Sequence, residues 1–495
     1  MRRIASMEWG GGGGGPLGYR RLMEAADYRR CAESPASTSG SSPAAARCSA
    51  GQESLFRALR RLALGAGCLL SSVSAHPQPA PDFDSCVHSL RAQLPKQPPV
   101  SAETFDRYTR GAEDLRPLID RSTATQPEFK LPVWDYLARL VDAQREADGR
   151  AVLDREAVAL AAIERRHAVD AATAVAVFGV ETDYGRVPGR YPVVDATLSR
   201  ACLNLASRER KAHFYAALWL LQEGLVRPDT FRGSWAGAFG LTQFMPGTFL
   251  QNMDDGDDSG SIDIVDSVPD ALATTARYFK GLGWTAGLPW GIEVSVPREQ
   301  ALAWNALERD HACLEAEMPA GLCRGLDQWA AAGFRRIDGG ALLPEGPGSE
   351  SPLRPDTPAA LLMPGGIDGP AWLVTRNYQA AWRYNRADAY ALAIGLLADR
   401  LRGDPPMRAA WPTDDAALSR AEFAELQMLL RQRGHCEVTA DGHDGPRTRS
   451  AIEAEERWLG NNPTGRAGAR LLAALRAATP MEPVESPACA DVGPR

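Results

Sequence analysis

Apolar positions recur with helical spacing along most of the chain between Asp82 and about Arg400. The strongest runs are Pro132–Ala147, Arg155–Glu181, Glu209–Gly224, Val268–Gly281 and Ala387–Leu401. A looser section between Pro289 and Pro370 is rich in Gly and Pro, and it leads into the strand-like segment Ala371–Arg376. The pattern predicts a mainly α domain (class α+β overall) that carries a small mixed lobe.

The remaining segments divide the rest of the chain. Residues 403–415 are rich in Pro and Asp and predict a linker. Residues 416–480 have a second helical pattern and predict a small domain, followed by a Pro-rich tail at 481–495 that we expect to be disordered. Residues 1–56, with a six-glycine run and a Ser/Ala/Pro stretch, show no helix or strand period, so we expect a disordered extension or a mis-assigned start codon.

Residues 57–75 have the three parts of a secretory signal. Basic residues beginning at Arg57 precede the apolar run Leu62–Leu70, and the small residues Val73-Ser74-Ala75 come before His76. We therefore expect export to the periplasm and a main domain at 76–402; the alternative for 57–75 is a basic amphipathic tail. Lipoprotein anchoring is not expected, because Gly65 stands before Cys68 where a lipoprotein signal has an aliphatic residue.

Charge and composition exclude two classes of function. Residues 1–75 hold ten Arg and five acidic residues, which leaves 45 basic against 57 acidic residues in the rest of the chain. This net negative charge argues against a nucleic-acid-binding protein. No later segment reaches the roughly 18 apolar residues that a membrane span needs, so we expect no transmembrane segment, and we expect a monomer.

Six cysteines follow the predicted signal: Cys86, Cys202, Cys313, Cys323, Cys436 and Cys489. An even number in an oxidising compartment permits disulfides. Cys313 with Cys323 and Cys436 with Cys489 are each close enough in sequence to pair, although the sequence leaves the connectivity open. No Cys-x-x-Cys or His-x-x-x-His spacing indicates a transition-metal site.

The main candidate for chemistry is Glu181. The segment Ala168–Val180 before it is almost continuously apolar, which predicts a helix buried on nearly every side, and Gly185 is a plausible helix stop. Burial and the negative end of the helix dipole both disfavour a charged carboxylate there, so its pKa should rise and let it hold and donate a proton. The alternative is a Glu that reaches solvent or pairs with Arg186.

A second motif, Gly233–Pro246, alternates small residues with aromatic ones. Gly237 and Gly240 allow the backbone to approach a ligand closely, and the aromatic rings offer flat faces to sugars. Ser234 and Gln243 can hydrogen-bond to hydroxyl or amide groups. The alternative is a tightly packed turn that leads into a helix.

Together, Val177–Gly185 (VFGVETDYG) and Gly233–Pro246 (GSWAGAFGLTQFMP) resemble the membrane-bound lytic transglycosylase B family, a lysozyme-like group that acts on bacterial cell-wall glycan. Tyr278–Trp284 and Arg383-Tyr384-Asn385 add two further matches in the same order. The resemblance covers roughly 82–402. It implies a lysozyme-like fold, with Glu181 as the catalytic residue. It also implies a substrate-binding set of Tyr184, Arg210, Lys211, Ser234, Gln243, Tyr278, Tyr384 and Asn385. Lys211 stands where the family usually has an arginine, which leaves a bidentate carboxylate contact there in doubt.

The resemblance implies a single-carboxylate lyase with peptidoglycan glycan strands as its partner and no cofactor for the chemistry. Glu181 would protonate the glycosidic oxygen between N-acetylmuramic acid (MurNAc) and N-acetylglucosamine (GlcNAc). It would then accept the proton of the C6 hydroxyl, so that a 1,6-anhydro end forms without water. The alternatives are a muramidase-type hydrolase of the same bond, which needs a positioned water, and a peptidoglycan-binding scaffold that does not cut. Asp183 is the nearest other carboxylate, but at i+2 on a helix it points away from Glu181.

An acidic loop at 255–266 fits the twelve-residue calcium-loop pattern. Its expected ligands are Asp255, Asp257, Ser259, Ser261, Asp263 and Asp266. Because the last ligand is Asp and not the longer Glu, we expect weak, structural binding of calcium or of sodium. The alternative is an acidic surface loop that binds no ion.

The C-terminal unit resembles the three-helix peptidoglycan-binding domain. The resemblance rests on Leu426–Leu430, Gly434 and the Gly/Asp-rich turn that leads through Asp441–Gly445 into a helix. Ala454-Glu455 replaces the usual Phe-Gln pair, which leaves peptidoglycan affinity open. The alternative is a helical appendage that binds no ligand.

Overall fold

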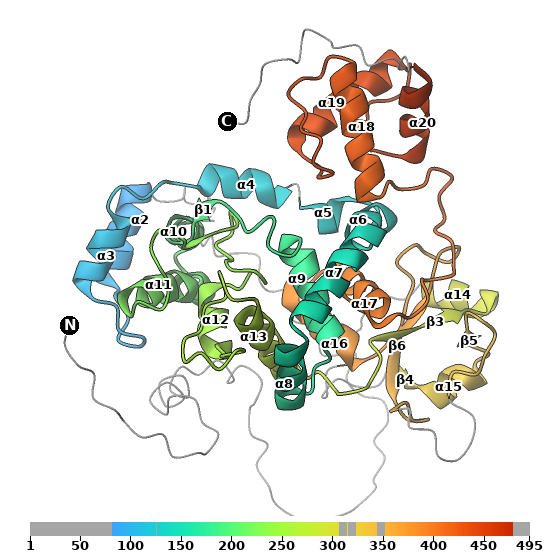
Figure 1. Ribbon diagram of the computed structural model, residues 1–495, viewed down its shortest axis with the longest axis horizontal. Helices are drawn as coiled ribbons and strands as arrows, with labels where there is room; N and C mark the ends of the chain where they lie inside the picture. The colour runs from blue at the N-terminus through green and yellow to red at the C-terminus, as the bar shows by residue number, and fades with distance from the viewer. Residues whose placement is uncertain (1–81, 125, 306–313, 315–322, 344–351, 479–495) are drawn as a thin grey trace, which may run out of the picture.

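The structure is a computed structural model that describes residues 82–124, 126–305, 314, 323–343 and 352–478. A large helical body forms its centre, a small sheet-containing lobe lies at one side, and a three-helix C-terminal domain lies at one end of the view in Figure 1. Within the described ranges, no helix is long and apolar enough to cross a bilayer. The expected extension (1–56), signal (57–75) and tail (481–495) fall outside the described residues.

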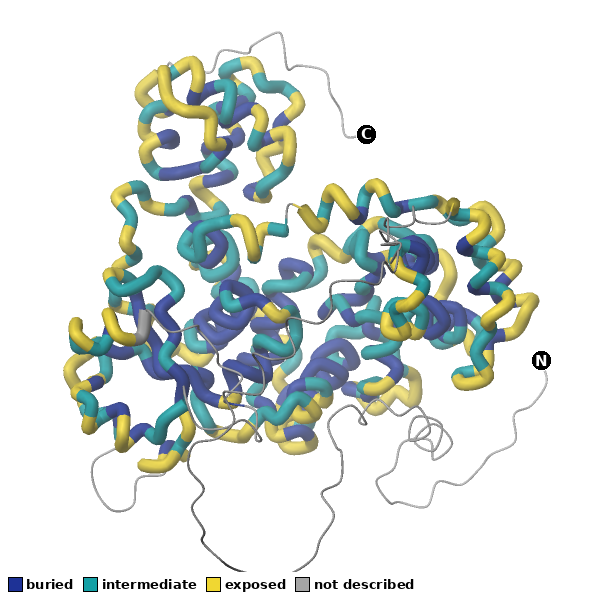
Figure 2. Tube along the Cα trace, turned by 180° about the vertical axis from the view of Figure 1, so that it is seen from behind, coloured by how far each residue is buried: buried dark blue, intermediate teal, exposed yellow. Residues whose placement is uncertain are grey.

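The helical body is built around one buried helix, α9 (Ala171–Thr182). Its residues from Ala172 to Gly179 are all buried, and it contacts α7, α8, α13 and α17. In order, the helices of the body are α2 (Phe83–Ala92), α3 (Ala102–Thr109), α4 (Arg116–Ala124), α5 (Pro127–Lys130), α6 (Val133–Leu140), α7 (Ala143–Arg155), α8 (Ala157–His167), α9, α10 (Val193–Leu203), α11 (Arg208–Gln222), α12 (Pro246–Asn252), α13 (Val268–Gly281), α16 (Arg376–Asn385) and α17 (Asp388–Arg402). Figure 2 shows the buried residues concentrated along these central helices.

Two of the predicted helical runs are each divided into two helices. The run Pro132–Ala147 is interrupted at Asp142, whose side chain accepts the N–H of Arg145 and begins α7. The run Arg155–Glu181 is interrupted at Ala168, which has φ 58°, and Asp170 caps the start of α9. Apolar periodicity continues across both breaks because both helices of each pair pack on the same core, so capping residues decide the boundaries.

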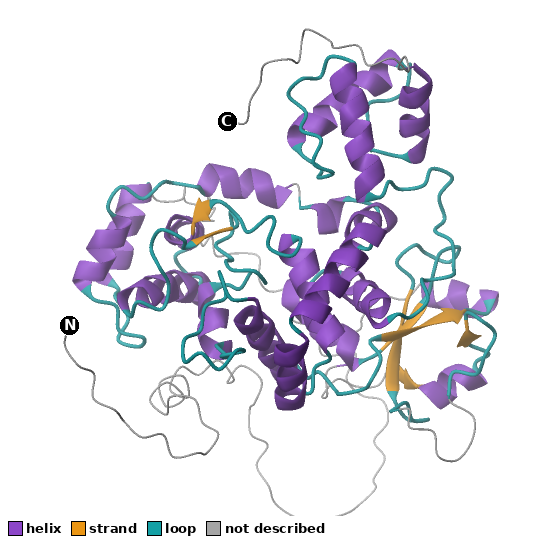
Figure 3. Ribbon diagram, viewed as in Figure 1, coloured by secondary structure: helices purple, strands orange, loops and turns teal. Residues whose placement is uncertain are grey.

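The lobe contains a five-stranded antiparallel sheet in the order β4-β6-β7-β3-β5, shown in orange in Figure 3. Its elements are β3 (Gly291–Ser295), α14 (Arg298–Asn305), β4 (Cys323–Gly325), α15 (Leu326–Ala331), β5 (Arg335–Arg336), β6 (Pro358–Leu362) and β7 (Trp372–Val374). In register, Leu373 of β7 lies opposite Ile292 of β3 on one side and Leu361 of β6 on the other. A separate core that includes Trp329 and Phe334 holds the lobe together. The predicted mainly α fold with a small mixed lobe is confirmed.

The C-terminal domain consists of α18 (Arg420–Gln432), α19 (Pro446–Trp458) and α20 (Ala469–Ala478). Phe423, Leu426 and Ile452 belong to its own buried core. The domain rests on the helical body where α18 meets α6 (Figure 1). A second small sheet pairs β1 (Tyr191–Pro192) with β2 (Arg232–Gly233) and fixes the start of the Gly233–Pro246 motif.

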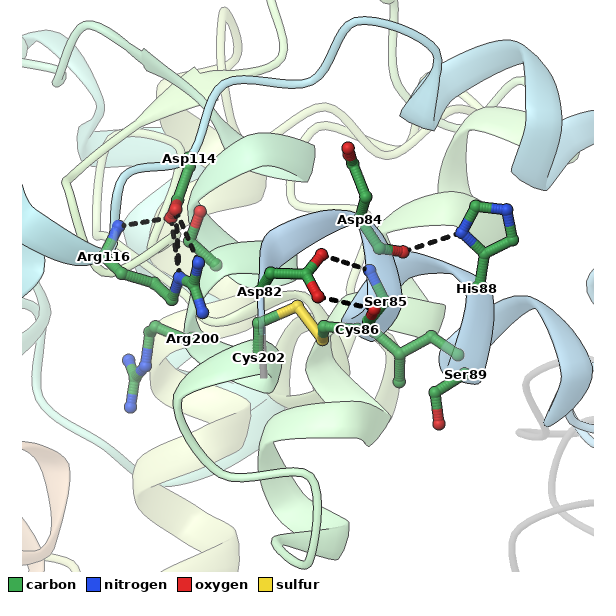
Figure 4. Close-up of a disulfide and its surroundings, with 12 residues drawn as sticks. Asp82, Asp84, Ser85, Cys86, His88, Ser89, Asp114, Arg116, Arg200 and Cys202 are labelled. Carbon is green, nitrogen blue, oxygen red and sulfur yellow. Dashed lines mark hydrogen bonds and ion pairs between the residues drawn. A yellow bond between two sulfur atoms is a disulfide. The ribbon is translucent and has the colours of Figure 1, made fainter. Parts of the chain in front are cut away.

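A disulfide between Cys86 and Cys202 joins α2 to α10 (Figure 4). Both cysteines are buried, and they are 116 residues apart in the chain. Sequence spacing did not predict this pair. Cys323 and Cys436 are also disulfide-bonded. Their expected partners, Cys313 and Cys489, lie outside the described residues.

Candidate active site

Glu181 occupies the last turn of α9, where the sequence placed it. The helix ends because Asp183 and Tyr184 adopt left-handed backbone conformations (φ 51° and 56°), and Gly185 continues the turn at φ 86°. Thr182, which follows Glu181, is buried and donates its hydroxyl to the carbonyl oxygen of Leu241 at 2.6 Å. The end of the helix is therefore fixed to the second motif.

The environment of Glu181 favours its protonated form. Burial raises the pKa of Glu181 to about 7, and the negative charge of Glu128 acts in the same direction. The hydroxyl of Tyr390 donates to Oε1 of Glu181 at 2.6 Å, which opposes part of that rise because this hydrogen bond favours the carboxylate. A carboxyl group with such a pKa can give up a proton and take it back near neutral pH.

A wall of aromatic rings stands beside this carboxyl group. Tyr390 of α17 stacks on Tyr384 of α16 with centroids 6.0 Å apart, and Tyr384 contacts Tyr278 at 5.4 Å. The hydroxyl of Tyr384 donates to the carbonyl oxygen of Thr242 at 2.6 Å. Burial first, and then the charge of Glu181, raises the pKa of both Tyr384 and Tyr390. These tyrosines therefore remain neutral hydroxyl donors next to Glu181.

The Gly233–Pro246 motif forms a folded loop against this wall. A Cβ on Gly233 would lie 1.9 Å from the carbonyl oxygen of Ala238, so only glycine fits there. The Ser234 hydroxyl accepts the N–H groups of Ala236 and Ala238 at 3.3 and 3.2 Å. Gln243, at φ 51°, donates from Nε2 to the carbonyl oxygens of Gly240 (2.8 Å) and Pro188 (3.1 Å). Both side chains therefore hold the loop in shape.

Three of the predicted substrate residues have other contacts. Tyr184 packs edge-on against Phe178 and donates to the carbonyl oxygen of Arg145 at 2.9 Å, so it faces the interior next to α7. Arg210 donates to the carbonyl oxygen of Arg200 at 3.4 Å, and Lys211 donates to Gln93 at 3.3 Å. These contacts connect neighbouring helices and do not join the Glu181 cluster. Asn385 ends α16 directly after Tyr384 and is partly buried.

Sequence reasoning missed two residues of the site. Tyr390 lies in the apolar run of α17, where a buried tyrosine reads as core, and its contact with Glu181 spans 209 residues of sequence. Glu128 lies in the four-residue helix α5, too short to give a periodic signal. A tyrosine in an otherwise aliphatic helix was the one available sign, because a buried phenol usually needs a hydrogen-bond partner.

The acidic loop brings three carboxylates together. Ligand oxygens of Asp255, Asp257 and Asp270 all lie within 4.8 Å of one another. Asp270, in the first turn of α13, was not predicted, because the twelve-residue pattern ends before it. Its carboxylate accepts the N–H groups of Gly256 and Asp263, both at 2.8 Å.

The remaining predicted ligands of this loop have contacts of their own. Asp266, the predicted last ligand, forms an ion pair with Arg227 at 2.8 Å and is not among the three clustered carboxylates. Asp263 accepts the N–H groups of Val265 and Asp266, and the hydroxyls of Ser259 and Ser261 lie 3.2 Å apart. Three clustered carboxylate oxygens suit a hard cation such as Ca²⁺.

Two family models match the chain. The model of the transglycosylase SLT domain matches residues 82–399, and the model of a peptidoglycan binding domain matches residues 419–475. Among curated proteins, the membrane-bound lytic murein transglycosylase B of Escherichia coli (strain K12) is 28% identical over 229 residues, which are 45% of this chain and 54% of that protein. The chain therefore spans about half the length of this relative.

Solved structures share the fold. The structure of SltB3 from Pseudomonas aeruginosa in complex with NAG-anhNAM-pentapeptide is 38% identical and has a TM-score of 0.56, covering 80% of this chain and 99% of that one. The structure of the Escherichia coli lytic transglycosylase Slt35 in complex with calcium is 21% identical with a TM-score of 0.50, covering 65% of this chain and 93% of that one.

Proposed function

This chain belongs to the family of the transglycosylase SLT domain, and from that premise we propose that it cleaves the β-1,4 bond between MurNAc and GlcNAc in peptidoglycan, leaving 1,6-anhydro-MurNAc ends. The observation that carries the proposal is a single carboxyl group, Glu181, whose pKa of about 7 allows it to act first as acid and then as base.

In the first step, Glu181 donates its proton to the glycosidic oxygen as the bond between that oxygen and C1 of MurNAc breaks. The N-acetyl group of the substrate stabilises the developing positive charge at C1. In the second step, the C6 hydroxyl attacks C1, and Glu181 takes up the proton that this hydroxyl loses. The enzyme returns to its starting state, and no water enters the product. Tyr390 steadies the carboxylate between the two steps through its 2.6 Å hydrogen bond.

Asp183, the carboxylate nearest to Glu181 in the sequence, is held in ion pairs. Asp183 accepts hydrogen bonds from Arg145 at 3.2 Å and Arg420 at 2.6 Å, and these guanidinium groups lower its pKa against the opposing effect of burial. A two-carboxylate hydrolase needs a free second group at a defined distance. The ion pairs of Asp183 therefore favour the one-carboxylate lyase.

Product analysis tests this proposal. Purified peptidoglycan sacculi are digested with the enzyme, and the released muropeptides are analysed by mass spectrometry before and after borohydride reduction. We expect anhydro ends, which borohydride leaves unchanged. Reducing ends that gain two hydrogens would show a hydrolase, and an absence of released products would show a scaffold.

The pH dependence follows from the protonation of Glu181. Because the acid form starts the reaction, kcat/KM should stay level at acidic pH and fall about tenfold per unit as pH rises above about 7. Tyr390→Phe removes a hydrogen bond that favours the carboxylate, so the pKa of Glu181 should rise and the falling limb should move to higher pH. Initial rates on soluble glycan strands measure both.

Tyr378→Phe is the matched control for this shift, because Tyr378 is also buried on the neighbouring helix and its hydroxyl donates to Asp388, not to Glu181. The pH profile of kcat/KM for Tyr378→Phe should fall at the same pH as that of the wild type. A limb that moves to lower pH in Tyr390→Phe would contradict the assigned role of this hydroxyl.

For the acidic loop, we propose a structural cation site for calcium, or sodium, formed by Asp255, Asp257 and Asp270. The closeness of their ligand oxygens, within 4.8 Å of one another, supports it, because Ca²⁺ is bound by several oxygen ligands at once. The loop lies between the second motif and α13, which carries Tyr278, so the ion would stabilise one side of the site without entering the chemistry.

Asp255→Ala combined with Asp257→Ala should lower the melting temperature and abolish any rise that calcium produces. A ligand that binds only the native state stabilises it by about 2.7 kcal/mol at a hundred times its Kd. Asp266→Ala, which removes an exposed carboxylate paired with Arg227, is the control and should keep the calcium-dependent rise. A wild-type melting curve indifferent to millimolar calcium and to sodium would eliminate the site.

We also propose that the protein is exported to the periplasm as a monomer and that its C-terminal domain contacts peptidoglycan. The match of residues 419–475 to a peptidoglycan binding domain supports this contact. In place of the missing Phe-Gln pair, Glu455 accepts one hydrogen bond from Arg433 at 2.8 Å, and its carboxylate lies 3.0 Å from Nε2 of His435. A pulldown of the full-length Glu181→Gln variant with purified sacculi tests this binding. The substitution is included because it prevents digestion of the sacculi.

A further inference from the structure

Among the described residues, four ion pairs join the C-terminal domain to the helical body, and three of them are shorter than 3 Å. Arg466 forms two hydrogen bonds to Asp135 of α6, at 2.7 and 2.9 Å, and Asp135 is only 2% exposed. Arg139 of α6 reaches Asp444 at 2.8 Å, and its guanidinium also lies over the ring of Phe423 at 4.8 Å. The third pair joins Arg420 to Asp183 at 2.6 Å.

These pairs differ from ordinary surface ion pairs in their burial. A buried carboxylate without a partner destabilises a protein by several kcal/mol, whereas exposed pairs contribute little. Asp135 and Asp183 are both almost fully buried. Each forms an ion pair with an arginine of the C-terminal domain, which compensates part of its negative charge. The domain is therefore docked in a defined orientation and does not hang freely from the linker.

The third pair ends directly at the helix that carries Glu181. Asp183 is the C-cap of α9, two residues after Glu181, and its N–H contacts the carbonyl oxygens of Gly179 and Phe178. Oδ1 of Asp183 accepts from the buried Arg145, and Oδ2 accepts from Arg420. The other cation near Oδ2 is Arg186 at 3.5 Å, which is half exposed.

Arg420 itself is held in place by the docked domain. It is the first residue of α18, it is only 14% exposed, and it also approaches Asp148 of α7 at 3.6 Å. The turn of its own domain packs on its stem, because a Cβ on Gly442 would lie 2.6 Å from Cγ of Arg420. The position of this guanidinium therefore follows the position of the domain.

We propose that Arg420 is a positioning residue for catalysis: by completing the ion cluster on Asp183, it fixes the end of α9, so that docking of the C-terminal domain sets the placement of Glu181. A catalytic acid must stand within hydrogen-bond reach of the oxygen that it protonates, and displacements near 1 Å cost large factors in rate. The C-terminal domain thereby acts on turnover of any substrate, and not only on attachment to the wall. This inference rests on the proposed function of Glu181.

The test compares the steady-state kinetics of full-length variants on soluble, uncrosslinked glycan strands, which need no anchoring. Arg420→Ala should lower kcat at least fivefold while KM stays within twofold, because substrate contacts are unchanged and the acid is displaced. Arg420→Lys retains a cation for Asp183 and should recover kcat to within about twofold of the wild type. The recovery separates positioning from a general loss of stability.

Arg476→Ala is the matched control, since it removes an arginine of the same domain whose partner, Glu425, is also in that domain and whose pair is exposed. Its kcat should equal that of the wild type. If thermal melting shows that Arg420→Ala is unfolded at the assay temperature, Arg420→Gln, which keeps an N–H donor without charge, takes its place under the same criteria.

The proposal is overturned if kcat of Arg420→Ala stays within twofold of the wild type, if KM rises instead of kcat falling, or if Arg476→Ala or Arg420→Lys loses as much activity. Mass spectrometry of the wild-type products separates this from the proposed function. Anhydro ends together with an unaffected Arg420 variant would remove the positioning role alone, whereas products without anhydro ends would remove the lyase reaction.

Discussion

Glu181→Gln should reduce muropeptide release by about 10²- to 10⁴-fold, which is the contribution of general acid–base catalysis to a reaction rate. Glutamine keeps the shape of the side chain and can still accept the hydrogen bond of Tyr390, but it has no proton to donate to the glycosidic oxygen. Release from sacculi and turnover of soluble strands should fall together, since both depend on the same acid. Residual activity above a few per cent of the wild type would contradict the assignment.

The melting temperature of the same variant is the control for its folding. The folded-state pKa of about 7 lies above the ordinary value of 4.5, so the stability associated with protonated Glu181 is fully present below pH 4.5 and is lost as pH rises through 7. At pH 8 the buried charge costs at most about 3 kcal/mol. Glu181→Gln removes that charge, so the variant should melt at or above the wild-type temperature at pH 8.

Replacing both Cys86 and Cys202 by alanine should lower the free energy of unfolding by about 3–5 kcal/mol. The disulfide closes a loop of 116 residues, and cross-links that close long loops restrict the unfolded chain most strongly. Alanine avoids burying new polar groups at two positions that are almost wholly inaccessible to solvent. Guanidinium unfolding of the oxidised proteins measures the difference.

The variant should nevertheless keep its activity below its melting transition, because the disulfide joins α2 to α10 and neither helix contributes to the Glu181 cluster. An unchanged unfolding midpoint would show that the cross-link contributes nothing to stability. Loss of activity in the folded variant would show that α2 or α10 reaches the site.

Sequence patterns predicted those helices and turns that depend on residues close together in the chain. The apolar segment before Glu181 predicted a buried helix, and α9 is that helix. The expectation that Gly237 and Gly240 bring the backbone close to a ligand stays a prediction. The contacts that the motif makes within the chain, such as that of Gly233 with Ala238, show its tight packing. Val268–Gly281 was predicted with the boundaries that α13 has, because Ser267 caps one end and the apolar face is continuous to the other.

Contacts between distant segments could not be predicted in the same way. Tyr390 reaches Glu181 across 209 residues, and Arg420 reaches Asp183 across 237 residues. Neither residue carries a local signal of its partner, because a tyrosine in an apolar helix and an arginine at a helix start are both ordinary. Asp270 was missed for a different reason, because it belongs to the next helix. Its carboxylate reaches the loop by accepting hydrogen bonds from the N–H groups of Gly256 and Asp263.

Digestion of soluble glycan strands in ¹⁸O-labelled water tests most directly whether one carboxylate performs the whole reaction. The account predicts anhydro-MurNAc ends that contain no ¹⁸O, because the C6 hydroxyl of the substrate is the nucleophile. Glu128→Gln removes the other carboxylate whose charge Glu181 senses, and it should leave the products unlabelled as well. Reducing ends that carry one ¹⁸O atom in the wild type, and that disappear in Glu128→Gln, would show instead that water attacks with Glu128 as its base.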